Sequence, residues 1–269
     1  MITEADRVGQ QRGLREAFKV QMQVLGALIM RELHTRYGRD NIGYLWLIGE
    51  PLMLGTVIAL LHSGQSSHEG DVDPVAFSVV GYSIFIIFRG IVNRAEGSLQ
   101  GNTPLLYHRM VTVLDVTLAR GILELGGTLA AFFVLAFLAN LLGFMSLPER
   151  PLYLALGIFY VFWLSMGLSM LIAGGTYERP LLERLVHPFT YFMMPLSGAF
   201  VRVSWLPETL RKAILWVPMA HMFETIRYGQ FASATLEYVD FEYLTAWCLG
   251  LSLAGLFAIR TVPARIHLG

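Results

Sequence analysis

The sequence has 269 residues, of which 55% are hydrophobic and only 15% charged, and its mean hydropathy is +0.54. Soluble domains carry roughly a quarter charged residues, so a chain this apolar is expected to have lipid rather than water around it. The formal net charge is zero, which does not indicate a nucleic-acid partner. The single cysteine, Cys248, can form no internal disulfide and is interpreted as a packing residue.

The N-terminal region, residues 1–41, is not typical of a secretory signal. Charges of both signs precede a short apolar stretch, and Arg31 and Glu32 follow it. Apolar residues recur there at steps of three and four: Phe18, Met22, Leu25, Ile29 and Leu33. This spacing predicts an amphipathic helix that lies in the plane of the membrane interface.

Six apolar stretches follow. A transmembrane helix needs about 20 apolar residues, and the stretches that approach this length are 42–61, 75–92, 111–144, 152–173, 185–201 and 243–259. Arg89 interrupts the second, and Pro188 and Pro195 break the fifth. The sequence therefore predicts an all-α membrane protein with six transmembrane helices in a single domain.

Basic residues predict the orientation. Residues 1–40 contain seven lysines and arginines, whereas the loop at 62–74 contains none. Because loops rich in lysine and arginine stay in the cytoplasm, we expect both termini to be cytoplasmic. The segment 202–240 also carries basic residues although this topology places it outside. Long segments count less in this rule, so the assignment is kept.

The segment 202–240 contains two short helical patterns, Trp205–Trp216 and Met219–Phe231, separated by Val217 and Pro218. Each is too short to cross a membrane. They predict a re-entrant helical hairpin near the periplasmic face, which is tolerated at membrane depth only where protein or water covers it. The alternative is an interfacial hairpin without a function in transport.

The motifs of an energy-converting or catalytic protein are absent from the sequence. A phosphate-binding loop needs G-x-x-x-x-G-K-[ST], and neither lysine, Lys19 or Lys212, stands in that context. There is no H-E-x-x-H or C-x-x-C motif, and His62 and His68 lack convincing ligand partners. We expect no catalytic residue and no metal site, so the energy must come from another polypeptide.

Three stretches carry a family resemblance. Arg31–Trp46 fills every position of R-E-x-x-x-R-[YF]-G-R-x-x-[IL]-G-[YF]-L-W, and Glu50 and Pro51 follow it. This pattern resembles the signature of type-2 ATP-binding-cassette exporter permeases that move polysaccharides, above all the inner-membrane permease of bacterial capsule polysaccharide export. Asn102–Arg120 and Trp216–Phe231 are similar to two further family motifs, although Val217 stands where the family has asparagine.

The resemblance implies six transmembrane helices, an N-terminal interfacial helix and re-entrant helices near the outer face. It implies a bacterial inner-membrane protein in which two permeases pair with two ATPase subunits. ATP and Mg would bind to those subunits and no cofactor to this chain. The implied partners also include a periplasmic co-polymerase-type adaptor and an outer-membrane export channel. A coupling helix within 95–108 would dock into the ATPase, with Glu96, Leu99, Gln100, Asn102 and Leu105 as its candidate residues.

Candidate residues of the substrate path come from the signature and from the aromatic side chains. Arg31, Arg36 and Arg39 suit either lipid headgroups or the anionic end of a lipid-linked glycan. Aromatic rings can stack on sugars without a fixed register, although lipid-facing packing is the simpler interpretation; the candidates are Tyr44, Trp46, Tyr191 and Phe192.

Charged residues inside the apolar stretches need partners. Glu50 precedes Pro51, which bends a helix, so Glu50 is interpreted either as part of a kink and helix contact or as a gate near the path. Arg120 and Glu124 are four residues apart and can pair on one helix face. Glu224 and Arg227, three apart, are expected to hold the hairpin together.

The predicted function is therefore the permease of an ATP-driven exporter that moves lipid-linked capsular polysaccharide from cytoplasm to periplasm. Alternatives within transport are another glycan, such as O-antigen or teichoic acid, or a drug or lipid. An intramembrane enzyme acting on lipid-linked sugars is a further alternative, but it would need paired acids or metal ligands at the membrane face, and the sequence shows none.

Overall fold

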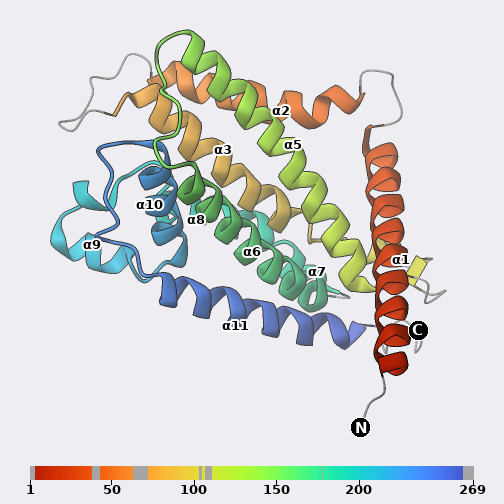
Figure 1. Cartoon of the computed structure of the whole chain (residues 1–269). Coiled ribbons are helices and arrows are strands. Elements are labelled where there is room, and N and C mark those ends of the chain that lie inside the picture. Colours follow the sequence, from red (N-terminus) through yellow and green to blue (C-terminus); the bar gives the residue numbers. More distant parts are fainter. Residues whose placement is uncertain are drawn as a thin grey trace.

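The computed structural model describes residues 4–37, 43–62, 72–102, 105–106, 111–177 and 179–262, and the secondary structure of this part is helical throughout. Figure 1 shows long helices side by side, with α1 and the last turns of α11 at one end of the molecule and α9 and α10 at the other. The helices with more than ten residues are α1 (Glu4–Tyr37), α2 (Gly43–His62), α3 (Pro74–Asn93), α5 (Val113–Leu141), α6 (Pro151–Thr176), α8 (Val186–Leu196), α10 (Pro218–Gln230) and α11 (Phe241–Arg260). The shorter ones are η1 (Gln100–Asn102), α7 (Pro180–Glu183), η2 (Val203–Trp205) and α9 (Glu208–Ile214).

Four helices are long and apolar enough to cross a membrane: α3, α5, α6 and α11. They match the predicted spans 75–92, 111–144, 152–173 and 243–259. The 20-residue helix α2 covers the predicted span 42–61, and its apolar part runs over Leu45–Leu61. The all-α class and a multi-pass membrane protein are therefore confirmed, whereas the number six stays a prediction.

Local sequence explains where these helices begin. Asp73 caps α3 by accepting hydrogen bonds from Val75 N (2.7 Å) and Ala76 N (3.3 Å). Thr112 and Asp115 form a reciprocal capping box at the start of α5. Asp115 thus has a structural role at a helix terminus, where a carboxylate also meets the positive end of the helix dipole.

The predicted fifth span over 185–201 is wrong as one continuous helix. The helix α8 has only 11 residues, about 16 Å at 1.5 Å per residue, against a hydrocarbon core of about 30 Å. Pro195 lies in its last turn, and Gly198 follows with φ +78°, a conformation that ends a helix. The chain then turns through 197–202 into η2.

Helix α3 is the centre of the bundle, with most of its residues buried. It packs against α2, α5 and α6, and α6 packs against α10 and α11. The buried apolar cluster runs through these helices and includes Phe85, Phe88, Phe132 and Phe223. Because neighbouring helices rather than lipid surround α3, this helix can contain a charged residue such as Arg89.

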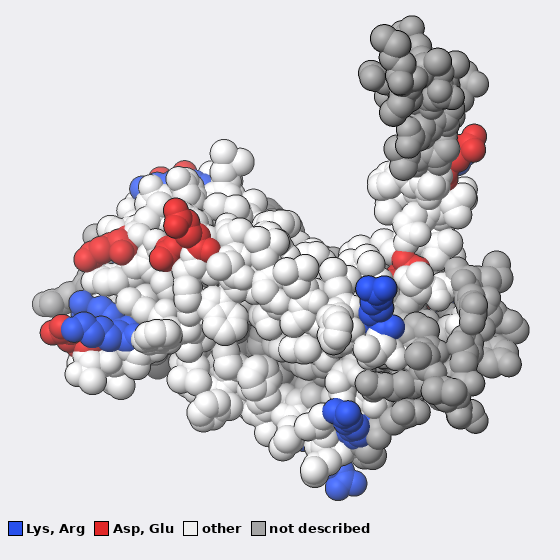
Figure 2. All heavy atoms as spheres, turned by 90° about the horizontal axis from the view of Figure 1, so that it is seen from below, with Lys and Arg blue, Asp and Glu red and all other residues white. Residues whose placement is uncertain are grey.

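The outer surface is apolar where the bundle would meet lipid. Figure 2 looks at the face that includes α11, and the middle of that face shows no lysine, arginine, aspartate or glutamate among the described residues. The exposed side chains of α11 include Trp247, Leu249, Leu253 and Phe257. Charged residues gather toward the two ends of the molecule, as expected for a protein that spans a bilayer.

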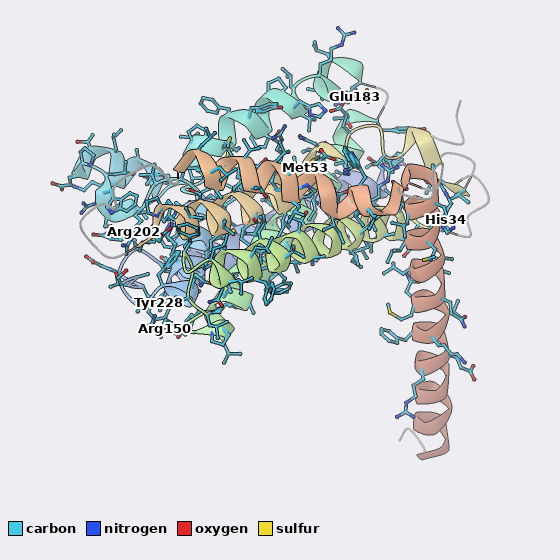
Figure 3. All side chains as sticks on the ribbon, turned by 90° about the horizontal axis from the view of Figure 1, so that it is seen from above. His34, Met53, Arg150, Glu183, Arg202 and Tyr228 are labelled. Carbon is cyan, nitrogen blue, oxygen red and sulfur yellow. The ribbon has the colours of Figure 1, made fainter. Side chains whose placement is uncertain are left out.

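Helix α1 does not lie flat against the bundle. Figure 3 shows it extending away from the other helices, and its contacts are with α5 and α2. Leu25 and Leu28 are buried, whereas Phe18 and Met22, on the predicted apolar face, are exposed. The other helices of the chain therefore cover only the C-terminal part of the apolar face of α1.

The segment predicted as a coupling helix, 95–108, differs from the prediction in its described part. Residues 94–99 form turns, with Gly97 at φ +61°, and η1 follows as a single 3₁₀ turn. The chain cannot continue as an α-helix through a residue with positive φ. Leu99, predicted as an anchor for the ATPase, is instead buried in a second apolar cluster with Leu106, Val116 and Met170.

Candidate functional site

A cavity of about 380 Å³ lies between four helices, within the size range of small-molecule sites. Its lining combines apolar side chains with an unusual number of charged ones for an apolar bundle. The lining residues are Leu47, Glu50, Pro51 and Leu54 of α2, Ile86, Arg89, Gly90 and Asn93 of α3, the C-cap residue Arg94 of α3, Glu124 and Thr128 of α5, and His187 and Tyr191 of α8. Glu50 and Tyr191 were both predicted as substrate-path residues, and the fold brings them to one cavity.

Arg89 and Tyr191 make a close polar contact on the cavity wall. Arg89 Nη2 donates to the Tyr191 hydroxyl at 2.5 Å, and the guanidinium carbon lies 4.3 Å from the ring centroid. Both the hydrogen bond and the cation–π contact attach α8 to α3. Thr190 Oγ1 donates to Asn93 Oδ1 at 2.8 Å and strengthens the same contact.

Glu50 projects from α2 immediately before Pro51, and no cation of the described residues lies within ion-pair distance of it. Arg89 likewise has no carboxylate partner in that part of the chain. Besides the paired Arg94 and Glu124, the cavity therefore presents the carboxylate of Glu50 and the guanidinium of Arg89 to whatever enters it. Such a pair suits a polar ligand with many hydroxyl groups, since a carboxylate accepts and a guanidinium donates hydrogen bonds.

Ion pairs between helices lie at one side of the cavity. Arg94 pairs with Glu124, and Arg120 Nε lies 3.1 Å from Glu32 Oε1 of α1. Spacing alone suggested a pair between Arg120 and Glu124, and the fold gives each of them a partner from another element. Glu32 and Glu124 are both buried, so the cations offset the cost of burying the carboxylates.

The predicted coupling segment is attached to several elements by polar contacts. Glu96 Oε2 lies 3.6 Å from His187 Nε2 on the cavity wall. Asn102 is buried, donates to Ser98 O at 2.7 Å and accepts a hydrogen bond from Arg31. Arg31, predicted for the substrate path, thus holds α1 against this segment.

Two other predicted path residues, Trp46 and Phe192, are not among the residues that line the cavity. The side chains of Trp46 and Phe192 lie on the surface, and their exposed fractions are 55% and 68%. The residue Arg39 and the side chains of Arg36, Tyr44 and Gln100 lie outside the described residues. Leu105 is partly buried. Sequence reasoning missed Arg94 and His187, and its only signal for Arg89 was a charge inside an apolar span.

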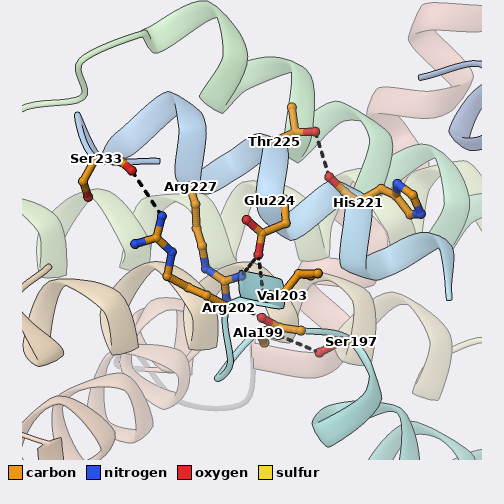
Figure 4. Close-up of polar contacts among 10 residues, drawn as sticks. Ser197, Ala199, Arg202, Val203, His221, Glu224, Thr225, Arg227 and Ser233 are labelled. Atoms are coloured by element: carbon orange, nitrogen blue, oxygen red, sulfur yellow. Dashed lines mark hydrogen bonds and ion pairs between the residues drawn. The ribbon is translucent and has the colours of Figure 1, made fainter. Parts of the chain in front are cut away.

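Glu224 and Arg227 form a separate, fully buried site (Figure 4). Arg227 Nη1 donates to Glu224 Oε1 at 2.8 Å, and both side chains are only 3–4% exposed. Glu224 also accepts from Val203 N at 3.0 Å, Arg227 donates to Gly198 O, and the guanidinium carbon lies 4.5 Å from the centroid of the Phe77 ring. The pair therefore joins α10, α3 and the turn after α8.

Burial lowers the pKa of the Arg227 guanidinium, and the neighbouring Glu224 carboxylate opposes that shift. Because an arginine pKa starts so high, the group keeps its charge at neutral pH. Because the fold of this chain buries both side chains, no substrate can reach them. Its function is structural.

Arg150 anchors the loop between α5 and α6 to α10 in a similar way. Figure 3 shows Arg150 beside Tyr228, and its guanidinium carbon lies 4.2 Å from the centroid of the tyrosine ring. Arg150 Nη1 also donates to Tyr228 O at 2.9 Å. Arg150 thus attaches the loop between α5 and α6 to the end of the bundle that carries α10.

Comparison with known proteins identifies relatives over nearly the whole length. The family model described as "ABC-2 type transporter" matches residues 23–231, which include the three stretches that carry the sequence resemblance. The capsule polysaccharide export inner-membrane protein CtrC of Neisseria meningitidis serogroup A is 36% identical over 245 residues, 91% of this chain and 92% of CtrC.

Two further relatives are similarly complete. The capsule polysaccharide export inner-membrane protein BexB of Haemophilus influenzae is 32% identical over 260 residues, 96% of this chain and 98% of BexB. The polysialic acid transport protein KpsM of Escherichia coli is 27% identical over 259 residues, 92% of this chain and 96% of KpsM. All three alignments extend through every helix that borders the cavity.

Proposed function

Because the chain belongs to the ABC-2 type transporter family, we propose that it is the inner-membrane permease of a capsular polysaccharide exporter. The observation that carries this proposal is the 36% identity to CtrC over 91% of the chain. The chain is a transport component and not an enzyme. A separate ATP-binding-cassette ATPase, with its own ATP and Mg, supplies the energy.

The assembly that we propose contains two copies of this permease and two ATPase subunits. A lipid-linked polysaccharide moves through it from cytoplasm to periplasm. A periplasmic co-polymerase-type adaptor and an outer-membrane channel continue the route. Both termini lie in the cytoplasm, and the hairpin that contains α9 and α10 lies at the periplasmic end. The arrangement supports this orientation, since α1 and the end of α11 lie opposite α9 and α10 (Figure 1).

The cavity supports a route for a glycan. Its apolar walls come from spans, and Glu50, Arg89 and Tyr191 supply an acceptor, a donor and a hydroxyl. Sugars present hydroxyl groups in every orientation, so a polymer that moves through the site can exchange hydrogen bonds with these groups one after another. The exposed aromatic residues Trp46 and Phe192 lie outside the cavity, where a second copy of the chain or lipid would cover them.

Deleting the gene in the bacterium that carries it tests the function. We expect the capsular polymer to accumulate in the cytoplasm and to disappear from the cell surface, with the intact gene restoring both. Polymer would be measured by carbohydrate analysis of cytoplasmic and surface fractions. Normal surface capsule in the deletion strain would contradict the proposal, and loss of O-antigen or teichoic acid instead would identify a different cargo.

Removing one charge from the cavity wall tests the route. A hydrogen bond to a charged group is worth about 1.5–3 kcal/mol, so we expect Arg89→Gln and Glu50→Gln each to lower the export rate roughly tenfold. The rate would be measured as surface polymer per unit time after induction. Arg260→Gln, at the exposed end of α11, is the matched control and should export normally. Equal rates for all variants would remove the cavity from the route.

A further inference from the structure

Four charged residues form a continuous chain from α1 to the cavity. Glu32 of α1 pairs with Arg120 of α5 across 3.1 Å. Arg120 Nη1 then donates to the backbone oxygen of Arg94 at 3.3 Å, and the Arg94 side chain pairs with Glu124. We call Glu32, Arg120, Arg94 and Glu124 the ion-pair chain. It ends on the cavity wall, which both Arg94 and Glu124 line.

The ion-pair chain adds charged contacts between elements that also pack against one another, α1 against α5 and α5 against α3. Arg94 is the C-cap of α3 and the first residue of the turns that precede η1. Its contacts therefore connect the end of a central span to the loop predicted to meet the ATPase. Arg31, the neighbour of Glu32 on α1, binds Asn102 of that same loop. A shift of α1 or of this loop must change the distances within the ion-pair chain.

Most side chains of the ion-pair chain are shielded from water. The side chains of Glu32, Arg120 and Glu124 are 10%, 19% and 7% exposed, so water cannot easily replace a lost partner of these three, whereas the side chain of Arg94 is 36% exposed. Charges in such surroundings keep their partners or change to a second defined arrangement, which is the property that transmission between two sites requires. Gly90 of α3 leaves the room that the Glu124 carboxylate occupies, because a Cβ there would lie 2.9 Å from Glu124 Oε2.

We propose that Arg120 and Arg94 are positioning residues that transmit movement of α1 and the 94–102 loop to Glu124, and thereby set the shape of the cavity. The inference rests on the proposed function, since the movement is supplied by the ATPase. Arg120 is not among the residues that line the cavity, and the side chain of Arg94, which does line it, is paired with Glu124. Each acts through the carboxylate that it holds.

The test uses the complete permease–ATPase assembly in proteoliposomes. A cysteine placed at Leu54 on the cavity wall, in a Cys248→Ser background, reports the cavity through its rate of labelling by a water-soluble maleimide. Rates would be compared without nucleotide and with ATP plus vanadate. With couplings between sites commonly 5–150-fold, we expect the two rates in this parent to differ at least about fivefold.

Glu32→Gln and Arg120→Gln are expected to bring the ratio of labelling rates below about twofold while the assembly still hydrolyses ATP. Glu32→Asp and Arg120→Lys, which keep the charges, should keep most of the difference. Glu16→Gln, an exposed carboxylate on the same helix, is the matched control. The double variant Glu32→Gln with Arg120→Gln should be no worse than Arg120→Gln alone, because that single change already removes both the pair with Glu32 and the hydrogen bond to Arg94 O.

Three results would overturn the inference, and they are distinguishable. If the parent shows the nucleotide-dependent difference and Glu32→Gln and Arg120→Gln keep it, the ion-pair chain does not transmit and the proposed function stands. If the parent shows no difference and no ATPase binds to it, the proposed function fails and the inference fails with it. Transmission would also be rejected if only the glutamine variants failed to assemble, while Glu32→Asp and Arg120→Lys assembled but showed no nucleotide-dependent difference in labelling rate.

Discussion

Replacing Arg227 by methionine is expected to lower the free energy of unfolding in detergent by about 3–5 kcal/mol, because Glu224 would become a buried charge without compensation. The same change removes the donor to Gly198 O and the cation over the Phe77 ring. The turn after α8 would then lose its attachment to α10. Thermal unfolding followed by intrinsic fluorescence, with the monodisperse fraction after heating, measures the loss.

Two comparisons show whether the buried charge is the cause. Lys212→Met breaks the Glu208–Lys212 pair, whose side chains are 77% and 74% exposed, and should change stability little. Glu224→Gln combined with Arg227→Met should recover more than half of the loss, since the amide oxygen still accepts from Val203 N and no charge remains buried. An unchanged unfolding temperature for Arg227→Met alone would show that the pair does not hold this end together.

Gly81→Ala is expected to lower the free energy of unfolding by about 1–3 kcal/mol, the usual range for overpacking a core. Gly81 lies in the middle of α3, and a methyl group there would overlap the carbonyl oxygen of Ala199. The obstacle is backbone, which cannot rotate away as a side chain can. The helix α3 and the turn after α8 would have to separate, and Arg227 of α10 donates to Gly198 O on that turn.

A second glycine provides the control. Gly250 of α11 has nothing within 4 Å of an added methyl group, so Gly250→Ala should be neutral or stabilise the helix by about 0.5–1 kcal/mol. Both variants change one helical glycine to alanine and differ only in their surroundings. Equal stability of the two variants would show that α3 and the turn at 197–202 are not in close contact.

The sequence predicted the helices that depend on composition and local capping. The four helices α3, α5, α6 and α11 begin and end close to the predicted positions, because hydropathy and N-terminal caps such as Asp73 and Asp240 act over neighbouring residues. The same reasoning failed for 185–201. Hydropathy reports how apolar a stretch is, and it does not report that Gly198 adopts a left-handed conformation and ends the helix.

The candidate site was predictable only in part. Glu50 and Tyr191 could be named because a carboxylate and aromatic rings in a span are unusual, but their common cavity needs α2 and α8 to meet α3. The partners of Arg120 and Glu124 show the same limit. Spacing along one helix suggests neighbours within a turn, whereas Glu32 comes from a distant helix and Arg94 from the end of another.

The membrane class, the prediction that the energy comes from another chain, and the family resemblance in Arg31–Trp46 and two further stretches came from the sequence alone. These are properties of composition and of short patterns, which do not depend on how distant segments pack. The tertiary structure decided which charges share the cavity, where the 94–102 loop attaches, and that Glu224 and Arg227 are sealed inside. Those outcomes depend on contacts between residues far apart in the chain, and only the packing of the helices against one another determines them.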